Sequence, residues 1–322
     1  MNRAIFLNSK DTARNLATEA YFYEEALGSD EALALLYVDS PSLVFGRSQN
    51  PYRELDWLAA AERQIPMYRR ISGGGAVYHD LGNLNYCFIV PRNPELVLNY
   101  AYFLEPLSNY LEKLGLQTEI LRKSNLYLRG KKISGNAMAL GRDKILAHGT
   151  VLFNSEIEPI EALLHRTTEG LSVTTVASDI AEVQTISELL PELSFSDFCS
   201  GLGAEIIGNG LRDYDFTASG LWPEEELAIE RDYVPRFKSF EWNFKRGPEF
   251  SLKRENASWL AQLKVKGAEI IEISFEPVAC DLDLGRIAQA LEGRRLERAE
   301  LLAALSFLGD ARAADFLKEL FA

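Results

Sequence analysis

Residues Arg69–Asp80, which read RRISGGGAVYHD, form the most informative segment of the chain. Its three consecutive glycines, Gly73–Gly75, remove side-chain bulk and permit positive φ angles, so backbone N–H groups can approach an anion or a flat ligand. Arg69 and Arg70 add delocalised charge that suits phosphate or carboxylate. A glycine-rich segment alone is more often a simple turn, but these flanking residues favour a binding loop.

The spacing of this segment excludes two common nucleotide motifs. It does not match the G-x-x-x-x-G-K-[ST] pattern of P-loop proteins, nor the G-x-G-x-x-G pattern of dinucleotide-binding domains. A nucleotide at this loop must therefore be held with another geometry.

A second polar segment, Arg122–Ala137, contains five cationic residues among its first eleven positions. Its pattern predicts a β-hairpin that turns at Arg129-Gly130. Neighbouring residues of a strand point to opposite faces, so one of Lys131 and Lys132 is expected to be solvated and the other to face the sheet or a pocket. A plain charged hairpin is the alternative interpretation.

Two of the three histidines lie in polar motifs, His79 before Asp80 and His148 before Gly149. For each alone a structural histidine is the simpler interpretation, and no paired spacing suggests a metal site. Three cysteines without a C-x-x-C motif fit a reducing compartment and exclude a cysteine-cluster metal site. Cys87 lies in an apolar strand and is predicted to be a buried small hydrophobe rather than a nucleophile.

The chain as a whole is predicted to be an α+β protein. Strands and helices are mixed without a strict β-α-β alternation, which argues against a doubly wound parallel sheet. Strands are expected near 5–7, 34–38, 43–45, 86–90, 126–128, 131–137, 146–153 and 263–276. Helices are expected at 12–26, 54–63, 94–114, 157–164, 194–208, 223–231 and, interrupted near Gly293 and Gly309, at 284–320.

The pattern changes around Gly247 and Pro248, which places a predicted domain boundary there. Residues 1–248 would form one domain, and residues 249–322 would form a small α/β domain of plausible though low size. No internal repeat or low-complexity tract interrupts either part.

The net charge of -13 is distributed unevenly along the chain. Residues 1–150 carry 17 basic and 16 acidic side chains, whereas residues 151–322 carry 17 and 31. A negative field of this size repels phosphate backbones and anionic lipid, so we expect no nucleic-acid partner and no membrane anchor. The start of the chain lacks a signal-peptide core and no apolar run reaches membrane-span length, so the sequence predicts a cytoplasmic protein.

Four further motifs occur in order with the glycine-rich segment: GRSQNPY at 46–52, KKISGNA at 131–137, HGTVLFN at 148–154 and EWNF at 241–244. Together with RRISGGGAVYHD, they resemble the lipoate-protein ligase family of the biotin and lipoate ligase superfamily. The resemblance implies the class II synthetase-like fold of that superfamily. This fold has a mixed β-sheet with flanking helices, followed here by a small accessory domain.

The resemblance implies a reaction in two steps. Lipoate and ATP would give lipoyl-AMP and pyrophosphate, and a lysine of an acceptor protein would then take the lipoyl group. The implied acceptors are lipoyl domains of 2-oxoacid dehydrogenase E2 subunits and the glycine-cleavage H protein. Activation is needed because a carboxylate is a weak acylating agent until a good leaving group is attached. Mg²⁺ is expected with ATP because the metal offsets phosphate charge.

The resemblance also assigns residues to the site. Lys132 matches the family's active-site lysine, which would contact the lipoate carboxyl group and the α-phosphate and stabilise charge that develops during adenylation. Further positions implied to bind lipoate or ATP are Arg70, Ser72, Gly73, Gly74, Gly75, Ala76, Val77, Tyr78, His79, Asn125, His148 and Gly149.

Two segments depart from the family pattern. Ser124-Asn125 stands where relatives commonly carry Asn-Asp, so a carboxylate that would serve the metal or the nucleotide is replaced by an amide. The segment Thr174–Ile186 lacks the arginines of the relatives' Ser-Val-Arg-Ser-Arg-Val stretch, so contacts with the acceptor or the adenylate are expected to differ there.

Three alternatives share the fold. An octanoyl- or lipoyl-transferase would form an acyl-enzyme on cysteine without ATP, against which the apolar setting of Cys87 and the presence of Lys132 argue. A biotin ligase should show a Gly-Arg-Gly-Arg loop where this chain has Ser72–Gly75. A weakened, non-catalytic paralogue that binds lipoylated proteins is the third, and Asn125 is the reason to consider it.

Overall fold

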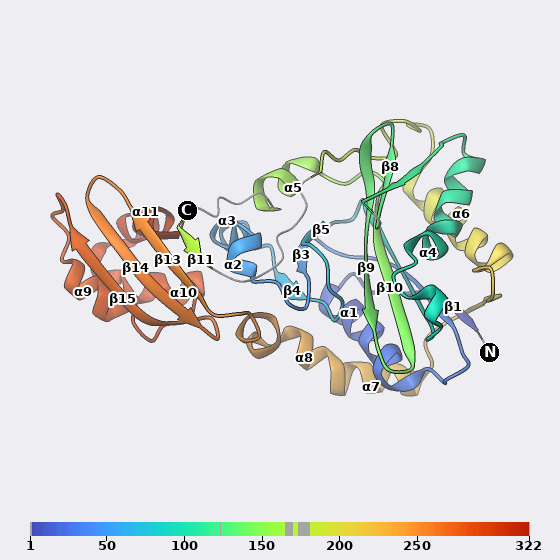
Figure 1. Cartoon of the computed structure of the whole chain (residues 1–322), viewed down its shortest axis with the longest axis horizontal. Coiled ribbons are helices and arrows are strands. Elements are labelled where there is room, and N and C mark those ends of the chain that lie inside the picture. Colours follow the sequence, from blue (N-terminus) through green and yellow to red (C-terminus); the bar gives the residue numbers. More distant parts are fainter. Residues whose placement is uncertain (1, 123, 165–169, 173–180, 322) are drawn as a thin grey trace. The chain divides into compact units, whose positions relative to one another are not determined.

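The computed structural model describes residues 2–122, 124–164, 170–172 and 181–321 (Figure 1). Contacts between residues divide the chain into two compact units. Unit 1 comprises Met1–Arg47, Met67–Glu161 and Ser178–Ser239, and unit 2 comprises Ser48–Pro66, Ala162–Ala177 and Phe240–Ala322. Each unit gathers separate segments, whereas the domains expected at 1–248 and 249–322 are continuous in sequence. The boundary at residue 248 stays a prediction.

Unit 1 is built on an eight-stranded mixed sheet, which confirms the predicted α+β class. β1 pairs in parallel with β12 and with β2, and the other neighbouring pairs are antiparallel. In spatial order the strands are β12 (Thr217–Ser219), β1 (Arg3–Phe6), β2 (Leu33–Val38), β6 (Asn83–Pro91), β10 (Lys144–Leu152), β9 (Lys131–Leu140), β8 (Asn125–Leu128) and β7 (Glu119–Leu121).

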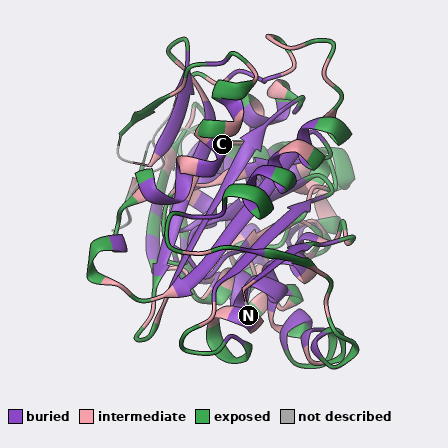
Figure 2. Ribbon diagram, turned by 90° about the vertical axis from the view of Figure 1, so that its right-hand side faces the viewer, coloured by how far each residue is buried: buried purple, intermediate pink, exposed green. Residues whose placement is uncertain are grey.

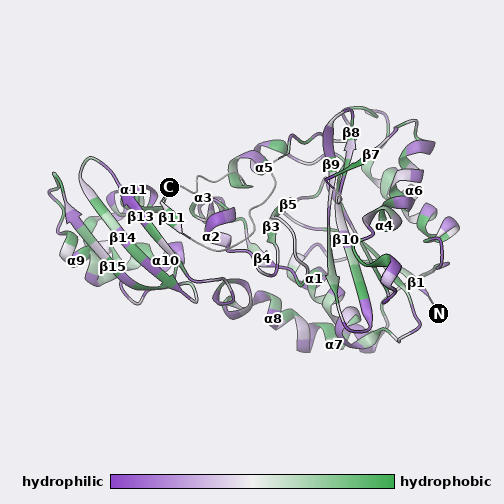
Figure 3. Cartoon of the chain, in the orientation of Figure 1, coloured by the Kyte–Doolittle hydropathy of each residue, from purple (hydrophilic) through white to green (hydrophobic). Residues whose placement is uncertain are grey.

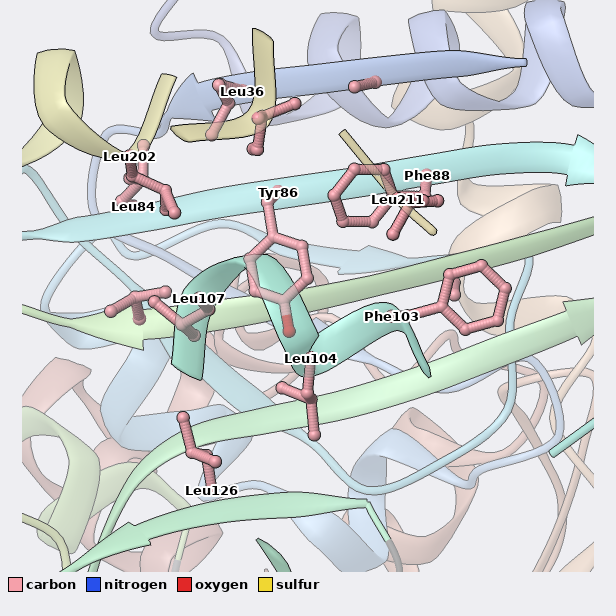
Figure 4. Packing of buried hydrophobic residues seen from close by; sticks show 14 of the residues in the cluster. Leu36, Leu84, Tyr86, Phe88, Phe103, Leu104, Leu107, Leu126, Leu202 and Leu211 are labelled. Atoms are coloured by element: carbon pink, nitrogen blue, oxygen red, sulfur yellow. The ribbon is translucent and has the colours of Figure 1, made fainter. Parts of the chain in front are cut away.

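The two faces of this sheet have different neighbours. Even-numbered residues of β2 and β6, such as Leu36 and Phe88, belong to the hydrophobic core that also contains residues of α4 (Tyr100–Lys113) and α6 (Phe195–Asn209) (Figure 4). Side chains alternate along a strand, so the odd-numbered residues point away from that core. Every residue of β2 is buried, which is typical of a strand covered on both faces. Buried residues, drawn in purple, are concentrated in the strands at the centre of the ribbon (Figure 2).

A three-stranded sheet carries the glycine-rich segment. β3 (Ser42–Phe45) lies between β4 (Met67–Arg69), which runs parallel to it, and β5 (Val77–His79), which runs antiparallel. The residues between β4 and β5 therefore form a loop at the end of β3. The sequence predicted β3 but neither of its partners, because a three-residue strand is too short to show a period.

In unit 1 the helices expected at 12–26, 94–114, 157–164, 194–208 and 223–231 start within one residue of their predicted positions, whereas the helix at Val234–Lys238 was not predicted. The helices of this unit are α1 (Thr12–Tyr21), the π-helical η1 (Phe22–Ala26), η2 (Pro94–Leu96), α4, α6, α7 (Pro223–Ala228), the π-helical η3 (Ile229–Tyr233) and α8 (Val234–Lys238), and α5 (Ile157–Leu164) follows β10. Gly115 ends α4 with a φ of +82°, so the predicted C-terminal glycine is confirmed. Among the described residues, no helix is both long enough and apolar enough to cross a membrane.

Unit 2 contains an antiparallel sheet in the order β11 (Leu171–Ser172), β13 (Phe250–Glu255), β14 (Trp259–Lys266) and β15 (Glu269–Pro277). Along these strands hydrophobic and hydrophilic residues are interspersed (Figure 3), as expected of a sheet with one covered face. The strand expected at 263–276 is divided, because the chain turns back at Gly267 and Ala268 with positive φ. Its helices are α2 (Pro51–Glu54), α3 (Trp57–Glu62), η4 (Glu241–Lys245), α9 (Leu284–Leu291), α10 (Arg298–Ala304), η5 (Ser306–Leu308) and α11 (Asp310–Phe321).

Candidate active site

A cavity of about 230 Å³ lies in unit 1 between the large sheet, the three-stranded sheet and α1. Its described lining combines three cations with imidazole, amide and hydroxyl groups and contains no Asp or Glu, so it suits an anionic ligand. The lining residues are Leu16, Tyr37, Val44, Arg70, Gly74, Gly75, Ala76, Val77, His79, Asn85, Arg122, Ser124, Asn125, Lys132, Gly135, Asn136, Ala137, His148, Gly149 and Thr150.

Two glycines shape the loop between β4 and β5. Gly74 has a φ of +85°, a conformation that costs little only without a Cβ atom. Gly46, directly after β3, is required for a different reason, because a Cβ there would lie 2.3 Å from the carbonyl oxygen of Gly74. The loop thus packs on the end of β3, and its residues Gly74–Ala76 form part of the cavity wall.

Arg69 lies under the loop rather than in the cavity. It is fully buried, and its Nη1 donates to the carbonyl oxygen of Arg47 at 2.8 Å. Its guanidinium carbon lies 4.7 Å from the centre of the Phe45 ring. The charge of Arg69 is therefore used inside the protein. Of the other cations in the two polar segments, Arg122 lines the cavity, and Lys123 lies outside the described residues.

Arg70 lines the cavity and also holds the loop. Its Nε donates to Ser72 Oγ at 2.9 Å, and its Nη2 donates to the carbonyl oxygen of Gly75 at 2.7 Å and to that of Gly73. Burial lowers the pKa of the Arg70 guanidinium to about 10, so the group stays charged at neutral pH. Arg70 therefore links the loop to a positive charge at the cavity wall.

Lys132 reaches the cavity because a glycine leaves room for it. A Cβ on Gly135 would lie 2.9 Å from Lys132 Nζ, so the lysine side chain passes directly over this glycine. Lys131 lies on the surface instead, with its Nζ 2.6 Å from Glu182 Oε1. The Lys132 backbone is fixed by its N–H bond to the Glu182 carbonyl at 2.9 Å and by the Gln184 N–H at 3.1 Å.

Each cavity histidine is held by a buried carboxylate. His79 Nδ1 lies 2.7 Å from Asp39 Oδ2, and His148 Nδ1 lies 2.8 Å from Glu19 Oε2. Both carboxylates have no exposed surface. Such a partner fixes the orientation of an imidazole and favours a proton on Nδ1. Both histidines were predicted from the sequence, but neither carboxylate was.

Asn136 explains the glycine of the HGT motif. The hydroxyl group of Tyr86 donates to Asn136 Oδ1, and Asn136 Nδ2 donates to the Ser124 carbonyl oxygen at 2.8 Å. A Cβ on Gly149 would lie only 1.9 Å from Asn136 Oδ1. Gly149 therefore leaves the space that this amide occupies. Asn125, another predicted site residue, is buried at the same wall.

The structure brings most of the predicted site residues together. Those that line the cavity are Arg70, Gly74, Gly75, Ala76, Val77, His79, Asn125, Lys132, His148 and Gly149. Ser72, Gly73 and Tyr78 lie next to this set but not in the lining, and strand alternation turns Tyr78 away from Val77 and His79. Their roles in binding stay predictions.

Several lining residues were not predicted from the sequence. Asn85 had a signal, since it is a polar residue inside the apolar run of β6. Tyr37 and Leu16 had none, because each belongs to an apolar pattern that is equally typical of a core position. Thr150 follows directly from His148 by the alternation of β10, but only once the inner face of that strand is known.

The described residues offer no thiol and no dedicated metal site to the cavity. Cys87 is fully buried in β6, and burial raises the pKa of its thiol well above 9. No cysteine belongs to the described cavity lining. In the same part of the chain, no group of three or more His, Cys, Asp or Glu residues is arranged to hold a metal ion.

Solved structures share the fold of this chain. The chain matches Ta0514 of Thermoplasma acidophilum, solved with bound lipoic acid, with a TM-score of 0.64 at 23% identity over 75% of this chain and 98% of that one. It matches a lipoate-protein ligase A solved with bound ATP with a TM-score of 0.65, at 23% identity and the same coverage. A bipartite lipoate protein ligase from T. acidophilum, studied with its E2 lipoyl domain, gives 0.65 at 22% identity over 75% and 95% of the two chains. The fold is therefore that of the biotin and lipoate ligases.

Sequence comparison narrows this class to one family. Residues 11–207 match the model of the lipoyl protein ligase A/B catalytic domain. Lipoate-protein ligase LplJ of Bacillus subtilis is 30% identical over 327 residues, which cover 96% of this chain and 97% of that protein. The chain belongs to the lipoyl protein ligase A/B catalytic domain family, and its enzyme class is lipoate-protein ligase.

Proposed function

We propose that the protein joins lipoate to ATP, releases pyrophosphate, and transfers the lipoyl group from lipoyl-AMP to a lysine of an acceptor protein. The observation that carries this proposal is a described cavity lining with Arg70, Arg122 and Lys132 and no carboxylate. A lipoate carboxylate and a triphosphate repel one another, and fixed cations offset that repulsion where the two must meet.

In this proposal Lys132 is the catalytic residue. The attack of the lipoate oxygen on the α-phosphorus displaces pyrophosphate and builds negative charge on the α-phosphate oxygens. An ammonium group already held above Gly135 stabilises that charge without a reorganisation of water. The proposal is supported by the match of Lys132 to the family's lysine and by its place in the cavity wall.

The apolar part of the cavity suits the acyl chain. Leu16, Val44, Val77 and Ala137 contribute apolar surface to the same lining that holds the cations. A ligand with a carboxylate at one end and an apolar body is therefore expected to bind in one orientation. The lipoic acid bound to Ta0514 and the ATP bound to lipoate-protein ligase A support these two ligand classes.

The described lining fits Mg²⁺ only in part. Mg²⁺ prefers carboxylate and phosphate oxygens. The side chains of this lining offer amide oxygens from Asn85, Asn125 and Asn136 and hydroxyl groups from Tyr37, Ser124 and Thr150, but no carboxylate. We therefore expect the metal to arrive with ATP and to be held mainly by phosphate oxygens. No step of the proposed reaction is assigned to it.

Acceptors of the proposed reaction are lipoyl domains of E2 subunits or the glycine-cleavage H protein. The study of a T. acidophilum ligase together with its E2 lipoyl domain supports this class of partner. In the segment Thr174–Ile186, where family arginines are missing, residues 174–180 lie outside the described part of the chain. We also propose a cytoplasmic location, which the three free cysteines favour.

ATP–pyrophosphate exchange with lipoate, octanoate or biotin tests the proposal. Exchange is expected with lipoate, and Lys132→Ala is expected to lower its rate by about 10²-fold or more. The matched control is Lys131→Ala, which removes only a surface ion pair with Glu182 and should keep most of the activity. Absence of exchange with all three acids over a range of Mg²⁺ concentrations would contradict the ligase proposal and favour a non-catalytic paralogue.

A further inference from the structure

A continuous chain of hydrogen bonds connects α1 to the glycine-rich loop. Glu19 Oε2 lies 2.8 Å from His148 Nδ1, and His148 Nε2 lies 2.6 Å from Ser72 Oγ. Ser72 Oγ accepts from Arg70 Nε at 2.9 Å, and Arg70 Nη2 donates to the Gly75 carbonyl oxygen at 2.7 Å. The four side chains that these hydrogen bonds connect are all buried: Glu19, His148, Ser72 and Arg70.

The donors and acceptors of this chain fix its direction. Arg70 can only donate, so Ser72 Oγ is an acceptor on that side and its own hydrogen is free to bond elsewhere. Its two possible acceptors are His148 Nε2 at 2.6 Å and the Gly73 carbonyl oxygen at 3.4 Å. We assign the hydrogen to the much shorter contact, which places the ring proton on Nδ1, facing Glu19. The hydroxyl group of Tyr37 donates to the other oxygen of Glu19 at 2.9 Å. Glu19 is thus the terminal acceptor of the chain.

A serine, a histidine and a carboxylate in this order also occur in hydrolases, where the serine is a nucleophile. Two observations exclude that role for Ser72 in this arrangement. Ser72 is only 1% exposed and does not belong to the described cavity lining, and one lone pair of its oxygen already receives Arg70. The group therefore transmits a hydrogen-bond constraint rather than attacking a substrate.

The constraint acts on the orientation of peptide groups in the loop. Arg70 holds the carbonyl oxygens of Gly73 and Gly75, so these oxygens cannot turn toward an anion in the cavity. Glycine peptides rotate easily, and a carbonyl oxygen turned inward would repel a carboxylate or phosphate. A guanidinium that is itself fixed by Ser72 prevents this rotation.

We propose that Glu19 is a positioning residue that fixes the glycine-rich loop for anion binding through His148, Ser72 and Arg70. The identity of the anion, the lipoate carboxylate or the ATP phosphate, rests on the proposed function. The connection between Glu19 and the loop does not rest on it, and amide exchange measures that connection without any substrate.

Hydrogen exchange of the amides at 73–77, followed by mass spectrometry on the full-length protein, tests the connection. Glu19→Leu is expected to accelerate this exchange about five- to ten-fold, the change that corresponds to one lost hydrogen bond. Glu19→Gln retains an oxygen acceptor for His148 and should restore the slow rate. Glu205→Leu is the matched control, since Glu205 is a buried carboxylate of unit 1 that bonds to Lys113 and Asn209.

Unchanged hydrogen exchange of the amides at 73–77 in folded Glu19→Leu protein would overturn the proposal. Equal acceleration of this exchange by Glu205→Leu would overturn it as well. Should Glu19→Leu fail to fold, Ser72→Ala interrupts the same chain nearer the loop and must accelerate the same amides. A double-mutant cycle on the KM for ATP in the exchange assay adds a functional readout. If Glu19 acts through Ser72, the KM for ATP of the double variant Glu19→Leu/Ser72→Ala should be no higher than that of the more severe single variant. A rise in KM equal to the product of the two single effects would contradict the proposal.

If the protein shows no pyrophosphate exchange but Glu19→Leu accelerates amide exchange at 73–77, the proposed function is contradicted and the positioning role of Glu19 is supported. Normal pyrophosphate exchange in the unaltered protein, together with unchanged amide exchange at 73–77 in Glu19→Leu, would support the proposed function and contradict the positioning role of Glu19. The two proposals therefore fail separately.

Discussion

Lys132 Nζ lies 2.9 Å from the point that a Cβ of residue 135 would occupy, so the position of the proposed catalytic charge depends on a single absent methyl group. The clash is with the far end of a flexible side chain, which can move at little cost to folding. Moving an ammonium group by about 1 Å in a catalytic site has a much larger effect on rate than on stability.

Gly135→Ala is therefore expected to separate activity from stability. We expect the pyrophosphate-exchange rate to fall about 10- to 100-fold, while the free energy of unfolding changes by less than about 1 kcal/mol. Exchange kinetics and chemical denaturation measure the two effects. The double variant with Lys132→Ala should be no slower than Lys132→Ala alone, and a further loss would show that Gly135 acts by another route.

Cys87 provides a prediction that bears on the transferase alternative. Burial first, and the nearby Glu19 second, raise the pKa of its thiol well above the ordinary value of a cysteine, which favours the protonated form. We expect no alkylation of Cys87 by N-ethylmaleimide in the folded protein between pH 7 and 9, because the thiolate is the reactive species. Peptide mapping checks this, with the less buried Cys280 as internal control.

The activity of Cys87→Ser supplies the complementary measurement. The ligase proposal expects this variant to keep most of its pyrophosphate exchange, since the thiol is not part of the described cavity lining. Complete loss of transfer in a folded Cys87→Ser protein would favour an acyl-enzyme mechanism.

At the scale of elements, the site depends on how two sheets meet. β3 supplies the surface on which the glycine-rich loop rests, and the loop begins at the end of β4 and finishes at the start of β5. The long elements were predictable because each spans several periods of its pattern. β4 and β5 were not, since three residues show no period and these strands exist only through their pairing with β3.

Gly46→Ala tests the packing of the loop on β3. A Cβ at this position would lie 2.3 Å from the Gly74 carbonyl oxygen, which is a backbone atom and must shift with the loop. We expect a loss of about 1–3 kcal/mol in the free energy of unfolding and at least a ten-fold rise in the KM for ATP and lipoate.

The control for this variant is Gly208→Ala in α6. A Cβ there meets no atom within 4 Å, so the substitution should stabilise the protein by up to about 1 kcal/mol through helix propensity. If Gly46→Ala left both stability and KM unchanged, the close packing of loop and strand would have no role in the site.

At the scale of the whole molecule, segments far apart in the chain share one unit. In unit 2 the hydroxyl group of Tyr52 donates to the Leu296 carbonyl oxygen at 3.2 Å, and its ring lies 5.8 Å from that of Phe250. The rings of Trp57 and Phe321 lie 5.3 Å apart. The short helices α2 and α3 therefore have their partners at the far end of the sequence.

A protein ending at residue 248, the predicted boundary, should consequently be unstable. It would expose the buried side chains of Tyr52 and Trp57, each worth about 1.5–3 kcal/mol of burial. We expect a lower melting temperature and self-association, measured by thermal unfolding and analytical ultracentrifugation. Lys318→Ala in the full chain removes only an exposed ion pair with Glu62 and should leave the melting temperature nearly unchanged.

A monomeric truncated protein with an unchanged melting temperature would instead show that residues 1–248 fold as an independent domain. That result would support the continuous domains expected from the sequence over the segmented units seen in the contacts.

The sequence by itself determined the α+β class, the family and the glycine-rich loop, and its resemblance to the family led to the prediction that Lys132 is the catalytic lysine. These follow from local patterns, because strand and helix periods and compact motifs are written in neighbouring residues. Only the tertiary structure decided that Lys131 is a surface residue and that Arg69 lies under the loop. It also decided that Glu19 and Asp39 hold the two histidines.

The physical reason is the distance along the chain over which these contacts form. Glu19 and His148 are 129 residues apart in sequence, and Asp39 and His79 are 40 apart. Each carboxylate lies in a segment whose local pattern predicts only a helix or a strand end. Its partner is set by strand order and register, which bring together residues that no local pattern connects.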